Sequence, residues 1–223
     1  RLNILLVGLD DSRVRNYGTM TSTDTMMVAS INTRTGDMVL VQVPRNMART
    51  PFPEGSALAS AYPNGFYDGY NPDDPNYMAN AIWSNVPAEH PELFKNSDYK
   101  NADALKLGLE GAIGLKLDYF VALDIDGLVG LINAMNGVRL NVNERIPIAG
   151  SSGKRPTGYI EPGPNQHLDG YHAMWYARSR SASTDFDRMG RQSCVVKAVI
   201  DQANPQTMLT RYEAIAKASS QAV

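Results

Sequence analysis

An uninterrupted apolar run at the start of the chain constrains the fold most. Residues 2–8 read LNILLVG and lead to Asp10 and Asp11, which predicts a buried strand that ends in a polar loop. Residues 25–31 and 38–43 flank a turn-like segment and predict an antiparallel hairpin. A sheet that begins in this way needs a second layer of structure to cover it.

Helical and strand patterns alternate through the rest of the chain. Residues 102–113, 127–135 and 169–177 predict helices, and residues 119–124 and 138–142 predict strands. The chain has 223 residues, of which 43% are hydrophobic, so one large domain can bury a substantial core. We therefore expect an α/β fold over residues 1–223, a single-domain α-β-α sandwich with a central mixed sheet flanked by helices.

Two segments show no regular pattern. Residues 51–91 carry seven of the thirteen prolines and are rich in Gly, Asn, Asp and Tyr, which predicts a long irregular insertion. Residues 146–167 hold four more prolines and four glycines and are expected to form turns. An irregular segment as long as the first is usually functional or mobile.

The charge balance excludes one class of partner. Lys and Arg together number 21 and Asp and Glu 23, for a net charge of -2 at pH 7. Nonspecific nucleic-acid binding depends on neutralising phosphates, so no nucleic-acid partner is expected. The basic residues are nevertheless 14 Arg against 7 Lys, and guanidinium groups match phosphate and carboxylate geometry. Local binding of an oxyanion is therefore indicated.

Cysteine and membrane signals are sparse. Cys194 is the only cysteine, so no disulfide can close within the chain, and its place beside an apolar helical stripe predicts a buried thiol. No run reaches the roughly 18 to 20 apolar residues of a membrane span, and no signal peptide is recognised. Because the sequence starts at Arg1 and not at Met, we expect a leader or an anchor to precede it.

Four arginines fall within residues 178–191. Such a run is usually a solvated helix face. The spacing of Arg188, Gln192, Val195 and Val199 places them instead on one helical stripe, whose aliphatic end must face the core. A buried guanidinium needs an anion, so Arg188 predicts either an aspartate of the protein or a ligand phosphate.

Further charged groups follow the predicted strands. Arg45 comes directly after a proline at the end of the hairpin, and Arg49 comes four residues later. They are either an ordinary surface pair or additional donors to an anion. Asp10, Asp11 and Asp24 lie at strand ends that should open on one side of the sheet, which indicates either salt bridges or a Mg²⁺ site.

Several common catalytic patterns do not occur in the sequence. There is no HExxH pair, no G-x-x-x-x-G-K-[ST] loop and no G-x-S-x-G elbow. A zinc hydrolase, a Walker-type nucleotide site and an α/β-hydrolase nucleophile are therefore not expected.

Five segments together resemble one known family. They are NILLVGLD at 3–10, STDTMMVASIN at 22–32, VPRNMARTPFP at 43–53, and residues 115–142 and 167–194. In order and spacing they are similar to the extracytoplasmic domain of the LytR-CpsA-Psr family, cell-wall glycopolymer ligases of Gram-positive bacteria, over nearly the whole length. Arg45-Asn46, NAIW at 80–83 and Arg-Gln-Ser-Cys at 191–194 resemble the actinobacterial branch, which implies a decaprenyl carrier.

The resemblance implies a set of site residues. Asp24, with either Asp10 or Asp11, would bind Mg²⁺ or Mn²⁺, Asp11 being extra relative to the usual G-x-D-x-R pattern. The diphosphate would bind to Arg45, Arg49, Arg178, Arg180, Arg188 and Gln192, and the catalytic set would be Asp24, Arg45, Arg178 and Arg180. A lysine that some members use is replaced here by Met78, so that contact is not expected.

The resemblance also implies a reaction. A glycopolymer would be moved from a polyprenyl-diphosphate carrier to a hydroxyl of peptidoglycan, expected at C6 of N-acetylmuramic acid, with pyrophosphatase activity as a side reaction. The polymer could be teichoic acid, capsule or arabinogalactan. A single-pass anchor outside this chain would hold the enzyme on the outer face of the cell membrane.

A prenyl tail exposes too much apolar surface to remain in water, so a long apolar cavity is expected. Its candidate lining is Leu128, Leu131, Ile132, Val195 and Val199, although the same side chains could simply pack against each other. The alternative function is a noncatalytic polyprenyl-phosphate-binding or regulatory module of the cell envelope. A transcriptional regulator is disfavoured by the net charge and by the lack of a helix-turn-helix pattern.

Overall fold

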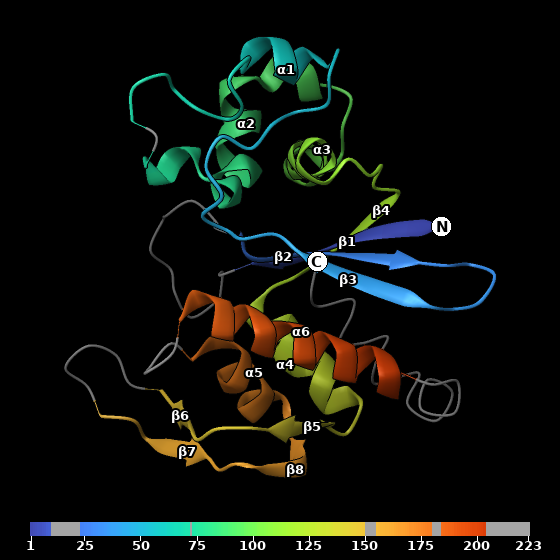
Figure 1. Ribbon diagram of the computed structural model, residues 1–223, viewed down its shortest axis with the longest axis vertical. Coiled ribbons are helices and arrows are strands. Elements are labelled where there is room, and N and C mark those ends of the chain that lie inside the picture. The colour runs from blue at the N-terminus through green and yellow to red at the C-terminus, as the bar shows by residue number, and fades with distance from the viewer. Residues whose placement is uncertain (10–22, 72, 150–154, 180–183, 204–223) are drawn as a thin grey trace. The chain divides into compact units, whose positions relative to one another are not determined.

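The computed structural model describes residues 1–9, 23–71, 73–149, 155–179 and 184–203 (Figure 1). The chain divides into two compact units, Arg1–Ala122 and Leu123–Val223, each with its own hydrophobic core. The predicted single domain over residues 1–223 stays a prediction, and the units are described in turn. Within the described ranges, no helix combines the length and the apolar character that crossing a membrane requires.

A four-stranded sheet forms the centre of the first unit. Its strands are β1 (Leu2–Leu9), β2 (Thr23–Ile31), β3 (Met38–Gln42) and β4 (Tyr119–Leu123), in the order β3-β2-β1-β4. β1 pairs antiparallel with β2, and β2 with β3, so the predicted first strand and hairpin are confirmed. Met26 and Val28 on one face of β2 and Met27 and Ala29 on the other are all buried, which makes β2 an interior strand.

Helices cover the sheet of the first unit. They are α1 (Ala57–Ala61), α2 (Ile82–Glu89) and α3 (Lys100–Ile113), with 3-10 helices η1 (Pro75–Tyr77), η2 (Ala79–Ala81) and η3 (Pro91–Phe94). Figure 1 shows α1, α2 and α3 gathered on one side of the sheet. Ile82 of α2 and Leu105 of α3 are fully buried in one core cluster with Leu5 of β1. The predicted α/β class, with helices packed on a central sheet, is therefore confirmed.

The prediction that residues 51–91 are irregular throughout is wrong for α1 and for α2. Ile82 and Val86 lie one turn apart on the buried face of α2. Pro87 lies inside the helix, and polar residues interrupt its few apolar ones. The sequence therefore shows no clear helical period here. Tertiary burial of that face outweighs the unfavourable proline.

In its described residues, the second unit contains three helices and two small sheets. The helices are α4 (Ile125–Ala134), α5 (Gly170–Arg178) and α6 (Asp185–Gln202). β5 (Val138–Val142) pairs antiparallel with β8 (Gly163–Leu168), and β6 (Ile146–Ile148) with β7 (Gly158–Ile160) (Figure 1). Each helix begins at a side-chain cap, from Asp124, Asp169 and Thr184 respectively, as helix N-termini require.

Two expectations for this unit need correction. Residues 138–142 form a strand as predicted, but β5 pairs with β8 and is not in the β3-β2-β1-β4 sheet. Residues 146–167 are not only turns, because they supply β6, β7 and most of β8. Strands of three residues leave almost no alternation to recognise in a sequence, so their pairing depends on the core that they cover.

Candidate functional site

The carboxylate of Asp24 lies at an irregularity in the sheet. Gly8 of β1 is opposite Thr25, but Leu9 is opposite Thr23, so Asp24 is an extra residue with no partner on β1. Such a β-bulge bends the strand and redirects a side chain, and bulges are frequent beside active sites. Gly8 is required here because an added Cβ would lie only 2.9 Å from the Cβ of Thr25.

Asp24 forms an ion pair with Arg45. Nη1 of Arg45 donates to Oδ1 of Asp24 at 2.7 Å, and their side chains are 28% and 25% exposed respectively. The partners come from the start of β2 and from the segment that follows β3. Of the two alternatives for this aspartate, the structure contains the salt bridge, and the carboxylate remains accessible to solvent.

Asn80 holds the backbone on both sides of this pair. The backbone amide of Asn80 donates to the backbone carbonyl of Arg45 at 3.0 Å. The backbone carbonyl of Asn80 accepts from Oγ1 of Thr23 at 3.1 Å. Thr23 is fully buried and directly precedes Asp24. The positions of Asp24 and Arg45 are therefore fixed by one residue of η2.

Arg49 has an unusual backbone conformation. Its φ is 52°, a backbone angle that residues other than glycine rarely adopt. An added Cβ at Gly65 would lie 2.3 Å from the Arg49 carbonyl oxygen, so only glycine fits against this turn. Cζ of Arg49 lies 4.6 Å from the centre of the Tyr67 ring, a cation–π contact. Arg49 therefore shares a short, strongly constrained segment with Arg45.

The predicted stripe on α6 is confirmed. Arg188, Gln192 and Val195 are buried, at 2%, 8% and 2% exposed, and Val199 packs partly buried against the same core. Nη2 of Arg188 lies 2.9 Å from Oδ1 of Asp185, one turn earlier. The sequence predicted either an aspartate of the protein or a ligand phosphate beside Arg188, and the structure contains the aspartate, Asp185.

A reciprocal capping box starts α6. The side chain of Thr184 accepts from the Asp187 amide, and the Asp187 carboxylate accepts from the Thr184 amide at 2.8 Å. Hydrogen bonds from the Thr184 side chain and backbone hold the pKa of Asp187 below its usual range. The cap fixes the first turn of the helix, which carries Arg188 at its end.

Arg191 has a role that the sequence did not reveal. It is buried, and its guanidinium donates to the carbonyls of Tyr176 and Ser179 at the end of α5 and to the carboxylate of Glu144. The run of arginines in residues 178–191 was the only signal, and it does not distinguish this residue from its neighbours. Arg178, a predicted diphosphate ligand, is the partly buried last residue of α5.

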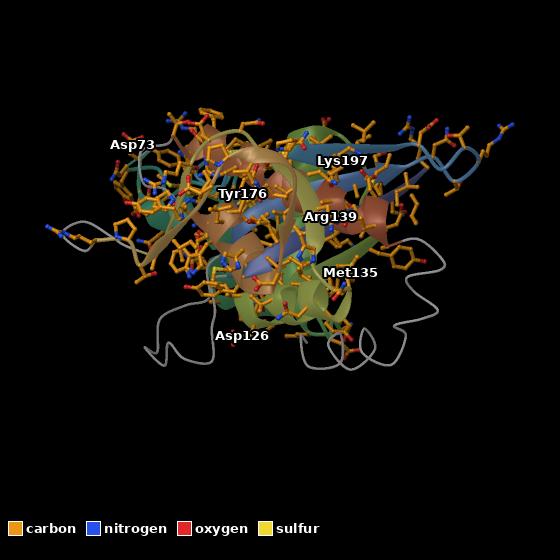
Figure 2. All side chains as sticks on the ribbon, turned by 90° about the horizontal axis from the view of Figure 1, so that it is seen from below. Asp73, Asp126, Met135, Arg139, Tyr176 and Lys197 are labelled. Atoms are coloured by element: carbon orange, nitrogen blue, oxygen red, sulfur yellow. The ribbon has the colours of Figure 1, made fainter. Side chains whose placement is uncertain are left out.

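Cys194 is exposed, so the prediction of a buried thiol is wrong. Its neighbour Val195 faces the core, and one residue of helix is enough to turn Cys194 away from it. Tyr176, labelled in Figure 2, is buried, and its hydroxyl donates to the Asn141 carbonyl at 3.4 Å. Burial, with a smaller effect of Cys194, raises the pKa of Tyr176 to about 12, which keeps this hydroxyl neutral.

Four of the five candidate lipid-contacting residues belong to the core of the second unit or pack against it. Ile132 and Val195 are buried in one cluster, and Leu128 and Val199 pack partly buried against it. Leu131 is partly exposed on α4. The structure therefore agrees with mutual packing of these side chains, and the prenyl cavity stays a prediction.

The fit of a metal ion depends on Asp24. Magnesium prefers carboxylate oxygens and is commonly bound by one or two carboxylates together with substrate phosphates. Asp24 is an accessible oxygen donor and fits this chemistry as one ligand. No group of three metal-ligating side chains occurs among the described residues. Asp10, Asp11 and Arg180 lie outside the described residues, so their predicted roles stay predictions.

The geometry thus brings the predicted residues together in two sets. Asp24 contacts Arg45, and Arg49 lies four residues further on the same segment of the first unit. In the second unit, Arg188 and Gln192 lie on α6, and Arg191 of the same helix donates to the carbonyls of Tyr176 and Ser179, on either side of Arg178. The sharing of one diphosphate by all of these groups stays a prediction.

Comparison with known proteins gives a consistent family match. The profile described as the LytR_cpsA_psr family matches residues 1–223. TagU of Oceanobacillus iheyensis, named a polyisoprenyl-teichoic acid–peptidoglycan teichoic acid transferase, is 24% identical over 94% of this chain and 54% of TagU. LcpA of Corynebacterium glutamicum, named a cell wall biosynthesis protein, is 26% identical over 93% of this chain and 41% of LcpA. The chain spans about half the length, or less, of these relatives.

Solved structures show the same fold. TagV of Bacillus subtilis superposes with a TM-score of 0.66 at 22% identity, over 99% of this chain and 72% of TagV. A LytR-Csp2A-Psr enzyme from Actinomyces oris superposes with a TM-score of 0.59 at 14% identity, over 97% of this chain and 68% of that enzyme. The fold is therefore shared with both proteins.

Proposed function

Because the chain belongs to the LytR_cpsA_psr family, we propose that it transfers a glycopolymer from a polyprenyl-diphosphate carrier to a hydroxyl of peptidoglycan. Two relatives, TagU and TagV, carry the name of such a transferase, with teichoic acid as the polymer. The acceptor that we propose is the C6 hydroxyl of N-acetylmuramic acid. The observation that carries the proposal is the contact between Asp24 and Arg45.

In the proposal, Asp24 is the acid–base group and its contact Arg45 is the phosphate-binding group. In the proposed reaction, the acceptor oxygen attacks the phosphorus that bears the glycan, and the bond from that phosphorus to the prenyl phosphate oxygen breaks. A phosphodiester forms and prenyl phosphate leaves. Arg45 donates to phosphate oxygens as negative charge develops, and Asp24 accepts the proton of the hydroxyl.

The remaining predicted residues extend the proposed site. Arg49, Arg178, Arg180, Arg188 and Gln192 are proposed as further donors to the diphosphate. Asp24, with Asp10 or Asp11, is proposed to hold Mg²⁺ or Mn²⁺, which would supply charge neutralisation at the phosphates. Leu128, Leu131, Ile132, Val195 and Val199 are proposed to contact the prenyl chain. We also propose that an anchor outside this chain holds the protein on the outer face of the cell membrane.

The first test uses a soluble prenyl diphosphate. The chain is incubated with geranylgeranyl diphosphate, with either MgCl₂ or EDTA, and release of prenyl phosphate and inorganic phosphate is measured. We expect metal-dependent turnover, and a loss of about 100-fold in Arg45→Gln, the size seen when one donor to developing charge is removed. Arg34→Gln, which changes an exposed arginine at the β2–β3 turn, is the matched control and should retain full activity.

The outcomes separate the two functions. Tight binding of the diphosphate without turnover would support the noncatalytic module and overturn the transferase. Equal turnover in Arg45→Gln and wild type would remove Arg45 from the site. Mass spectrometry of lipid that co-purifies with the chain provides an independent check, because a bound prenyl phosphate identifies the class of carrier directly.

A further inference from the structure

Arg191 makes an unusually complete set of contacts within the protein. Its Nε donates to the Tyr176 carbonyl at 2.9 Å, its Nη2 donates to the Ser179 carbonyl, and its Nη1 donates to Oε1 of Glu144 at 3.2 Å. The side chain is only 7% exposed. Each of the three guanidinium nitrogens therefore has an acceptor in the protein, which is the arrangement of a structural support and not of a phosphate donor.

Two of the three acceptors are the carbonyls of a helix end. The last carbonyls of a helix have no partner within it, and a basic side chain can satisfy them and oppose the helix dipole. α5 ends at Arg178, and Ser179 leaves the helix with a ψ of 133°. Arg191 bonds to the chain two residues before Arg178 and one residue after it. The backbone of Arg178 is therefore held from both sides.

The chemistry of this support is specific to arginine. A planar guanidinium presents its donors in a fixed fork, so one side chain can reach two carbonyls at a defined separation. A lysine ammonium keeps the charge but offers no such fork. The contact with Glu144 is the least protected of the three, because the Glu144 side chain is 58% exposed.

We infer that Arg191 is a positioning residue, which fixes the end of α5 so that the Arg178 guanidinium is presented to the prenyl diphosphate. The inference rests on the proposed function, in which Arg178 contacts that diphosphate. Arg191 itself does not touch the ligand. Its contribution to binding therefore passes through Arg178, and it should disappear when Arg178 is removed.

A double-mutant cycle tests this dependence. Binding of geranylgeranyl diphosphate is measured by calorimetry for wild type, Arg191→Gln, Arg178→Ala and the double variant. We expect Arg191→Gln to weaken binding about 10-fold in the wild-type background and less than about 2-fold in the Arg178→Ala background, as coupled sites require. Arg191→Lys should resemble Arg191→Gln, because the fork and not the charge is needed.

A matched control comes from the same unit. Arg145 forms an ion pair with Glu161 at 2.9 Å and lies over the Tyr159 ring, but it is largely exposed. Arg145→Gln should bind the diphosphate as wild type does. Glu144→Gln, which removes only the exposed acceptor of Arg191, should weaken binding less than Arg191→Gln.

Hydrogen exchange gives a second readout that does not depend on ligand. Arg191→Gln should increase amide exchange at residues 176–179 and leave exchange in α4 unchanged. Equal losses of affinity from Arg191→Gln in both backgrounds, or unchanged affinity, would overturn the inference. If the wild type neither binds nor turns over geranylgeranyl diphosphate, the proposed function fails and the positioning role fails with it, while the exchange data still show whether Arg191 orders the end of α5.

Discussion

Oδ1 of Asp24 accepts a hydrogen bond of 2.7 Å from Nη1 of Arg45 across the gap between the start of β2 and the segment after β3. Both side chains are partly exposed, and ion pairs of this kind contribute only about 0.2–1 kcal/mol to stability. The pair is therefore expected to matter more for binding and chemistry than for folding, and this difference can be measured.

Asp24→Asn keeps the shape of the side chain and removes its charge. We expect turnover of geranylgeranyl diphosphate to fall by about 100-fold, since a general base and a metal ligand are lost together. The midpoint of urea unfolding should change little. Asp37→Asn in the exposed β2–β3 turn is the control and should keep its activity. Retention of activity by Asp24→Asn would remove this carboxylate from the mechanism.

Thr23, which directly precedes Asp24, donates a hydrogen bond from its hydroxyl to the Asn80 backbone carbonyl and so helps to position the Asp24–Arg45 pair. Thr23→Val removes the hydroxyl from a fully buried position, and we expect it to cost about 1 kcal/mol in the free energy of unfolding. Because Asn80 also holds Arg45, the variant should lose activity as well. Thr23→Ser keeps the hydroxyl and should retain activity even if it loses similar stability. Parallel denaturation and turnover measurements decide between these results.

Two glycines should respond in opposite directions to alanine. At Gly8 a Cβ would press against Thr25, so Gly8→Ala is expected to destabilise the protein by about 1–3 kcal/mol. At Gly190, exposed on α6, a Cβ would meet nothing within 4 Å, so Gly190→Ala should stabilise the protein by about 0.5–1 kcal/mol. Thermal unfolding of both variants provides the measurement. Stabilisation by Gly8→Ala would contradict the packing described for Gly8, and destabilisation by Gly190→Ala would contradict the open space at Gly190.

The cap of α5 predicts a pH dependence. The amide of His172 donates to Asp169, and this bond, together with a side-chain contact from His172, lowers the pKa of Asp169. A lowered pKa stabilises the folded protein above the unfolded value of about 3.9, and the benefit is lost as the pH falls through the folded value. Asp169→Asn keeps a neutral cap, so wild type should be the more stable protein at pH 7.

This difference in stability should shrink as the pH falls below about 4, because the wild-type carboxyl then becomes protonated and is neutral like the asparagine side chain. Melting temperatures of wild type and Asp169→Asn between pH 7 and pH 3 provide the comparison. A gap that stays constant over this range would mean that the charge of Asp169 contributes nothing to stability.

The parts of the fold that could be predicted are those with a continuous pattern in the sequence. The run at residues 2–8 and the two strands of the hairpin are mostly apolar, and they form β1, β2 and β3 as expected. The stripe from Arg188 to Val199 has helical spacing, so its burial on α6 followed from geometry alone. In each case, the spacing of the apolar residues matches one kind of secondary structure, a buried strand or a helix.

The parts that could not be predicted depend on partners that residue types do not encode. Arg191 binds backbone carbonyls of another helix, and every residue has a carbonyl, so nothing in the sequence marks Tyr176 or Ser179 as acceptors. Arg188 left two possible anions, and only the structure identifies Asp185 as its neighbour. The bulge at Asp24 likewise arises from the register of two strands and not from the composition of either.

The bulge at Asp24 adds a carboxylate to the sheet without taking part in its strand pairing. Asp24 alone among the residues of β2 has no counterpart on β1. A chain shortened by this single residue would align Thr23 and Thr25 as successive rungs of an ordinary ladder, with all other pairings intact. It would be a more regular protein with no carboxylate at this end of the strand. The pairing of β1 with β2 therefore does not require Asp24, which leaves its carboxylate for binding or chemistry.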